Sequence, residues 1–375
     1  MSIALSHPHL WPVPIVFVLC HACQGNPVSE RPLEQDSGGF PEESGWAGSA
    51  GSPGAAGSAG EGTTGSVDAG ASEAASEDAR PADAGDGGEA LDTCKEPCPL
   101  VHDQPVRDLA VDATHVYYSS GHGIWKVAKA GGAPTELALG LVRPATVKLT
   151  SNAVVALDYK RTIVTVRKTG ETVTTLLEDG NGFAQFWDIA VNEDVVVFLR
   201  TSTDHDGVVM SVPLAGGAPT VLAEADVGCW PQVGHGIALS PTHAYWGEGL
   251  SIRRVALNGG EAESVSIADD HAHALAVGPD HVYWAGSLGG ISFAPLEGGP
   301  ATAVQGGGMA GAIAVGSASV YWTSEQSLLW AGLGNVYGQV LRDGVSQITG
   351  VGVDDAYVYY GSDSETGVSL TRVAR

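Results

Sequence analysis

Basic side chains are scarce in this chain of 375 residues. Lysine and arginine together number 18, against 43 aspartates and glutamates, which gives a formal net charge of −25. Binding of nucleic acid needs clustered lysines and arginines that neutralise phosphates, and docking on anionic lipid needs a basic surface. The composition therefore argues against both kinds of partner.

The sequence also lacks the short motifs that mark common catalytic sites. It contains no HExxH zinc motif, no pair of CxxC motifs, no GxSxG nucleophile turn and no glycine-rich phosphate loop between a strand and a helix. Glycine is abundant instead, at 52 residues, which is typical of a chain with many turns. We expect no cofactor, and a divalent ion such as zinc or calcium belongs only to the alternative function given below.

Residues 1–23 resemble an export signal. The run LWPVPIVFVLC (10–20) has the length of the apolar core of a signal peptide and is too short to span a bilayer. The following letters resemble a bacterial lipobox, in which Cys23 is cleaved and lipidated, although Cys20 and His21 depart from that pattern. We predict a lipoprotein of the outer membrane or cell surface, otherwise a periplasmic or secreted protein. An ordinary secretory signal and a mis-assigned start are the alternatives.

Residues 24–93 are predicted to form a disordered acidic tether. Gly, Ala, Ser, Asp and Glu dominate this segment, so it cannot bury enough apolar surface to offset the loss of chain entropy. The first 92 residues hold 14 acidic residues and only two arginines. With Cys23 lipidated, such a segment holds a globular domain away from the membrane. An acidic tail that only improves solubility is the alternative.

A ten-residue phrase recurs seven times from residue 109 onward. Each copy joins a short apolar strand to a second strand through a polar turn, as in LAVGPDHVYW (275–284). The copies start at residues 109, 147, 189, 237, 275, 313 and 351, and four of the six intervals are 38 residues. A fixed period of this size indicates a repeat architecture. Aromatic pairs such as Tyr283 and Trp284 are predicted to pack between neighbouring repeats.

Each repeat continues with a third and a fourth strand after glycine-rich turns. Four short antiparallel strands in about 40 residues make one blade of a β-propeller. The seventh repeat stops after its third strand, whereas residues 94–108 precede the first repeat without a repeat of their own. We therefore predict an all-β, seven-bladed β-propeller over 94–375. Its N-terminal segment supplies the missing strand of the last blade, which leaves no open sheet edge.

The segments HVYWAG (281–286) and SVYWTS (319–324) resemble the YWTD repeat of the low-density-lipoprotein receptor class and, more broadly, the TolB-like and NHL-like propellers. YWTD domains have six blades, and this chain lacks the aspartate of their signature; Gly247, Ala285 and Thr323 follow its aromatic pairs. The resemblance implies a domain that binds proteins or peptides. In a minority of such families, which resemble gluconolactonases or amidating lyases, it implies a metal enzyme with ligands at the channel mouth.

The loops that lead into the innermost strands of a propeller converge on its axis. Two residues before each phrase stand Arg107, Ala145, Trp187, His235, His273, Gly311 and Thr349, which form one ring if the repeats superpose. The largest insertion, EADVGCWPQVGHG (224–236), adds Trp230 to this end of the ring. We predict a ligand-binding channel mouth formed by Arg107, Trp187, Trp230, His235 and His273. Trp230 as a plug of the mouth, rather than a binding anchor, is the alternative.

A metal site at the same mouth is the alternative function. The segment ADDHAHA (268–274) places Asp270, His271 and His273 near the ring, and His235 stands on the adjacent blade. Imidazole and carboxylate ligands that converge from loops suit zinc or another divalent ion. Such a site would belong to a metal-dependent hydrolase or lyase. Histidines that hydrogen-bond their own loop backbone are the other interpretation.

The cysteines suit an oxidising compartment. Cys94 and Cys98 are close enough in sequence for a local disulfide beside the closing strand, and Cys229 is left either buried or bridged to one of them. We predict a monomeric binding scaffold at the cell envelope, whose partner is a protein, a peptide or an envelope glycan. It meets the membrane only through its lipid anchor.

Overall fold

The computed structural model of the chain describes residues 96–375, except 160, 171, 181–184, 202–205, 227–235, 269, 287–288, 307, 325, 346–347 and 363–366. The chain separates into two units, Met1–Glu89 and Ala90–Arg375. The predicted signal peptide and tether, residues 1–23 and 24–93, lie outside the described residues, and so does Cys23. In the described part, no helix has the length and apolar character needed to cross a membrane.

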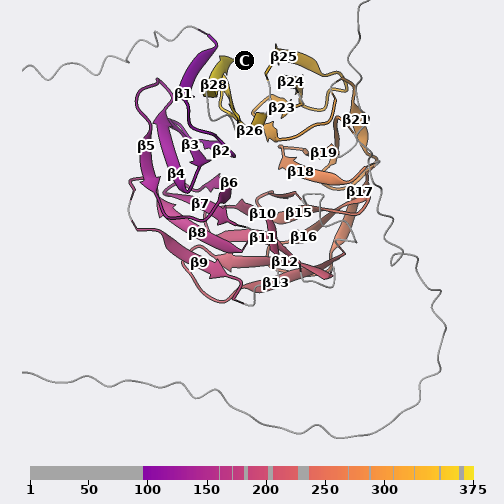
Figure 1. Ribbon diagram of the computed structural model, residues 1–375. Coiled ribbons are helices and arrows are strands. Elements are labelled where there is room, and N and C mark those ends of the chain that lie inside the picture. The colour runs from indigo at the N-terminus through magenta and orange to yellow at the C-terminus, as the bar shows by residue number, and fades with distance from the viewer. Residues whose placement is uncertain are drawn as a thin grey trace, which may run out of the picture. The chain divides into compact units, whose positions relative to one another are not determined.

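Seven sheets of four antiparallel strands form a ring (Figure 1). This confirms the all-β, seven-bladed β-propeller that the repeats predict. The innermost strands of neighbouring blades lie beside one another around the centre, for example β2 (Leu109–Val111) between β6 (Pro144–Leu149) and β26 (Ile348–Val353). We number the blades 1 to 7 in the order of their innermost strands.

The four strand positions recur in every blade (Figure 1). The innermost strands are β2 (Leu109–Val111), β6 (Pro144–Leu149), β10 (Gln185–Val191), β14 (Ile237–Leu239), β18 (Ala272–Val277), β22 (Ile313–Val315) and β26 (Ile348–Val353). The second strands are β3 (His115–Ser120), β7 (Ala153–Asp158), β11 (Val195–Thr201), β15 (His243–Glu248), β19 (His281–Gly286), β23 (Ser319–Thr323) and β27 (Tyr357–Ser362). The third strands are β4 (Gly123–Ala128), β8 (Thr162–Arg167), β12 (Asp206–Pro213), β16 (Ser251–Ala256), β20 (Ile291–Pro295), β24 (Ser327–Gly332) and β28 (Val368–Ala374). The outer strands are β5 (Thr135–Ala138), β9 (Thr174–Glu178), β13 (Thr220–Asp226), β17 (Glu263–Ile267), β21 (Thr302–Val304), β25 (Gln339–Asp343) and β1 (Cys98–His102).

The hydrophobic core is divided among the interfaces between blades. One cluster joins Tyr245 of blade 4 to Trp284 of blade 5, and the next joins Tyr283 of blade 5 to Trp322 of blade 6. These four aromatic side chains are at most 2% exposed, as the recurring aromatic pairs predict. Because no blade encloses a core of its own, each blade depends on its neighbours for stability.

The N-terminal strand closes the ring, as the incomplete last repeat predicts. Strand β1 pairs antiparallel with β28, with Cys98 opposite Arg372, so that blade 7 takes its outer strand from the start of the domain. Cys98 is fully buried and forms a disulfide bond. Cys94 and Cys229 lie outside the described residues, so the pairing of Cys94 with Cys98 stays a prediction.

An ion pair connects blades 1 and 2 at the end of the ring opposite the loops before the innermost strands. Lys168, which follows the third strand of blade 2, lies 2.9 Å from the carboxylate of Asp112 in the turn after β2 of blade 1. Its ammonium group also lies 5.2 Å from the centre of the Tyr117 ring. A lysine beside a carboxylate and over an aromatic face is stabilised by an ion pair and by a cation–π interaction. This contact helps to fix the position of blade 1 relative to blade 2.

Candidate functional site: the channel mouth and an arginine-lined cavity

The loops before the innermost strands line a cavity of about 360 Å³, here called the channel cavity. Six of the seven predicted ring positions line it: Arg107, Ala145, Trp187, His273, Gly311 and Thr349. They come from six different blades. The seventh ring position, His235, lies outside the described residues, and so does Trp230.

Two of the predicted ligand-binding side chains are held by neighbouring groups. Trp187 donates its indole N–H to the hydroxyl of Thr201 over 2.9 Å, and its ring packs against the core between blades 3 and 4. Arg107 donates through Nη1 to the carbonyl of Gly121 over 2.9 Å, while its Nε is buried without a hydrogen-bond partner. Trp187 is therefore a fixed wall of the cavity, and Arg107 keeps unused donor capacity.

A half-buried set of alternating charges lines the same cavity and was not predicted from the sequence. It consists of Asp108 on blade 1, Lys148 on blade 2 and Asp188 on blade 3. Burial raises the pKa of both carboxyls, and Lys148 offsets only part of that rise. Burial also acts to lower the pKa of Lys148, but attraction by Asp108 and Asp188 outweighs it, and the pKa of Lys148 is raised. The lysine thus stays charged between two carboxylates.

The two aspartates also connect neighbouring blades. Asp108 accepts a hydrogen bond of 2.8 Å from the backbone N–H of Val147 in blade 2. Asp188 accepts one of 3.2 Å from the backbone N–H of Ile237 in blade 4. One feature of the sequence indicates this set of charges. Lys148 occupies the second position of the phrase, where the other six repeats have Ala or Gly.

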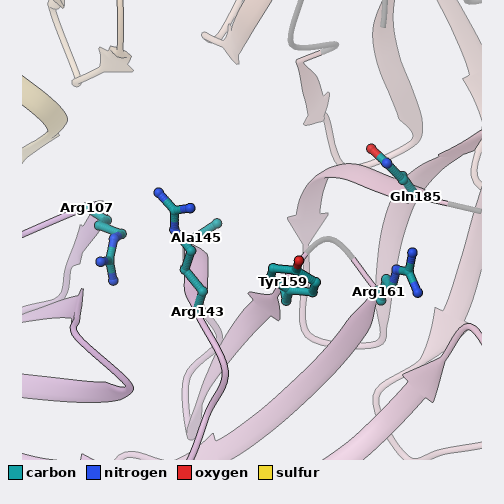
Figure 2. A pocket seen from close by; sticks show the side chains of 6 residues that line it. All are labelled: Arg107, Arg143, Ala145, Tyr159, Arg161 and Gln185. Carbon is teal, nitrogen blue, oxygen red and sulfur yellow. The ribbon is translucent and has the colours of Figure 1, made fainter. Parts of the chain in front are cut away.

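A second cavity, of about 570 Å³, lies beside the first over blades 1 to 3. We call it the arginine cavity, and it is lined by Arg107, Arg143, Ala145, Tyr159, Arg161 and Gln185 (Figure 2). Arg107 and Ala145 also line the channel cavity, so the two spaces share a wall. Of these residues only Arg107 was predicted as a site residue, since Arg143, Tyr159 and Arg161 do not occupy the ring position of the repeat.

The residues of the metal alternative are only partly brought together. Of its described members, His273 lines the channel cavity, whereas Asp270 accepts a hydrogen bond of 2.7 Å from the backbone N–H of His271 in the preceding loop. Among the described residues, no group of three or more His, Cys, Asp or Glu side chains could hold a metal ion. Because His235 is outside that part of the chain, the metal alternative stays a prediction.

Comparison with known proteins establishes the fold. No family model matches the sequence, and no curated protein matches it. The computationally designed protein Ika8 is 14% identical over 74% of this chain and 98% of its own, with a TM-score of 0.55. The WD40 β-propeller domain of Doa1 is 17% identical over 73% of this chain and 93% of its own, with a TM-score of 0.56. YCF48, solved bound to D1 peptide, is 14% identical over 75% of this chain and 96% of its own, with a TM-score of 0.54.

These similarities agree with the seven sheets and identify the chain as a β-propeller repeat protein. At identities of 14 to 17% they establish the fold alone. The closer resemblance to YWTD, TolB-like or NHL-like propellers stays a prediction.

Proposed function

We propose that this chain is an exported, lipid-anchored binding scaffold whose channel mouth holds a protein or peptide partner. The observation that carries the proposal is the channel cavity, where loops of six blades present apolar, cationic and imidazole side chains to one space. Convergent loops on a rigid scaffold are the usual place for recognition. YCF48, which shares the fold, was solved bound to D1 peptide. An envelope glycan is the other ligand class that such a mouth suits.

Site-specific photo-crosslinking in cells that produce this protein tests the binding site. A benzophenone amino acid at position 273 faces the channel cavity, whereas the same group at Asp280 lies in the turn at the opposite end of β18, with an exposed side chain. We expect crosslinked adducts that contain a second polypeptide at position 273 and none at position 280.

Two outcomes would contradict the proposal. Equal amounts of adduct at both positions would mean that the partner contacts the channel mouth no more than the opposite end of the blade. Adducts at position 273 that contain carbohydrate and no second polypeptide would assign the mouth to a glycan instead. Mass spectrometry of the isolated adducts separates these outcomes.

Lipid anchoring through Cys23 has a direct test. Labelling of cells with a radioactive fatty acid is expected to label the full chain and not the Cys23→Ser variant, because only a thiol at this position accepts the lipid. Cys20→Ser, a matched change three residues earlier, is expected to retain the label. Label in the Cys23→Ser variant would show that the lipid is attached at another residue. No label in the native chain would show that residues 1–23 act as an ordinary signal or as none.

A further inference from the structure

The arginine cavity concentrates positive charge on an acidic protein. Among the described residues, six line this cavity; three of these six are arginines and none of them is acidic, although the chain as a whole carries a formal charge of −25. Figure 2 shows the guanidinium groups of Arg107 and Arg143 on one side of Tyr159 and that of Arg161 on the other. Like charges gathered around one space repel each other, and a bound anion would relieve that repulsion.

The carboxylates near this cavity are already engaged elsewhere. Asp158 is buried and accepts hydrogen bonds from the backbone N–H groups of Val142 and Arg143, over 2.8 and 2.6 Å. Asp179 lies 3.1 Å from Arg200, with which it forms an ion pair. Within the described part of the chain, no ion pair engages any of the three guanidinium groups. The guanidinium groups of Arg143 and Arg161 are therefore available to a ligand, and Arg107 keeps the donors that it does not use for the carbonyl of Gly121.

The backbone that carries the arginines is firmly tied. Besides the two bonds that the Asp158 carboxylate accepts, the N–H of Tyr159 donates to the carbonyl of Arg143 over 3.1 Å, and the N–H of Arg161 donates to the carbonyl of Asp158 over 3.2 Å. Tyr159 has a positive φ of 51°, a conformation that costs free energy for a residue with a side chain and persists only where the surroundings enforce it. The carboxylate of Asp158 thus positions Arg143 and its backbone carbonyl holds Arg161, so the backbone that carries both arginines is preorganised.

We propose that the arginine cavity binds carboxylates of an acidic segment of the peptide or protein held at the channel mouth. This inference rests on the proposed function, because Arg107 and Ala145 line both cavities and a bound chain passes from one to the other along that shared wall. Guanidinium groups bind carboxylates in bidentate geometry, which favours arginine over lysine at such sites. A volume of about 570 Å³ exceeds what a single carboxylate needs. Tyr159, which is 55% exposed, offers its ring as an apolar wall to the rest of the segment.

Fluorescence anisotropy with a labelled eight-residue glutamate peptide tests the inference. The protein is the full chain with Cys23→Ser, and the matched probes are an eight-residue glutamine peptide and unlabelled citrate. We expect the glutamate peptide to bind, the glutamine peptide to bind at least tenfold more weakly, and the affinity to fall as salt is raised. The Arg143→Gln, Arg161→Gln double variant is expected to weaken binding at least tenfold.

The control is Arg167→Gln, which removes one positive charge, against two in the double variant, from the same blade at the far end of β8 (Thr162–Arg167) and should change the affinity less than twofold. Equal binding by the native chain and the double variant would overturn the inference. So would citrate that binds as tightly as the peptide, since the site would then serve small polycarboxylates. If polypeptide adducts still form at position 273 while the glutamate peptide does not bind, the proposed function stands and this inference alone is wrong.

Discussion

Replacing Leu100 by aspartate is expected to lower the free energy of unfolding by at least about 4 kcal/mol, because the change places an unpaired charge in the interface that closes the ring. Leu100 is 5% exposed on β1 and packs in the cluster that contains Val106, Tyr118 and Leu370. That cluster joins blade 7 to blade 1, so its loss also uncovers the edge of β28 for pairing with other molecules. Urea unfolding monitored by tryptophan fluorescence measures the change, and size-exclusion chromatography detects association.

The control is on the same strand. His102 also lies in β1 but is exposed, so His102→Asp is expected to stay within about 0.5 kcal/mol of the native chain. A Leu100→Asp variant that unfolds within about 1 kcal/mol of the His102→Asp control would mean that β1 does not hold the ring closed.

The fold and the ring positions were predictable because the repeats supply an internal register. The 38-residue period assigns each strand its place, and the incomplete last repeat identifies the segment that completes it. The same register identifies residues 107, 145, 187, 273, 311 and 349 as equivalent, and the structure brings these six positions together. Equivalent positions in a closed ring must converge, whatever their side chains are.

The arginine cavity could not be found in this way, because its residues are not equivalent. Arg143 lies before an innermost strand, whereas Tyr159 and Arg161 lie in the hairpin between the second and third strands of the same blade. They meet because Asp158, at the end of β7, caps the backbone at residues 142 and 143. Such a contact depends on the conformation of one hairpin, about which the repeat pattern carries no information.

Lys148, in contrast, could be recognised from the sequence, because the repeats define which positions are equivalent. A lysine stands alone in a position otherwise filled by Ala or Gly, which indicates a charge on the channel axis. Its partners Asp108 and Asp188 each stand directly before a phrase, where the other repeats have no acidic residue. Comparing the repeats position by position for charge, rather than for histidine alone, would have predicted this half-buried set of charges.

Replacing Lys148 by methionine is expected to lower the free energy of unfolding by about 2–3 kcal/mol at pH 7, because two carboxylates then share the channel without a counter-charge. Their pKa values, already raised by burial, rise further. A carboxyl whose pKa is higher in the folded than in the unfolded chain favours folding at low pH, and this contribution is lost as the pH rises through the folded-state pKa. The deficit of Lys148→Met should therefore shrink as the pH falls from 7 to 5, in urea titrations at each pH.

The triple variant Asp108→Asn, Lys148→Met, Asp188→Asn separates charge from packing. Its amide oxygens still accept the backbone N–H groups of Val147 and Ile237, which the two carboxylates accept in the native chain. We expect it to recover a large part of the lost stability at pH 7 and to lose the extra pH dependence, because replacing all members of a buried ionic set is less costly than removing one. The triple variant keeps every other side chain of the cavity, so it supplies the baseline with which the pH dependence of Lys148→Met is compared. A Lys148→Met deficit that is the same at pH 5 and pH 7 would show that the two carboxylates do not depend on this lysine for their charge.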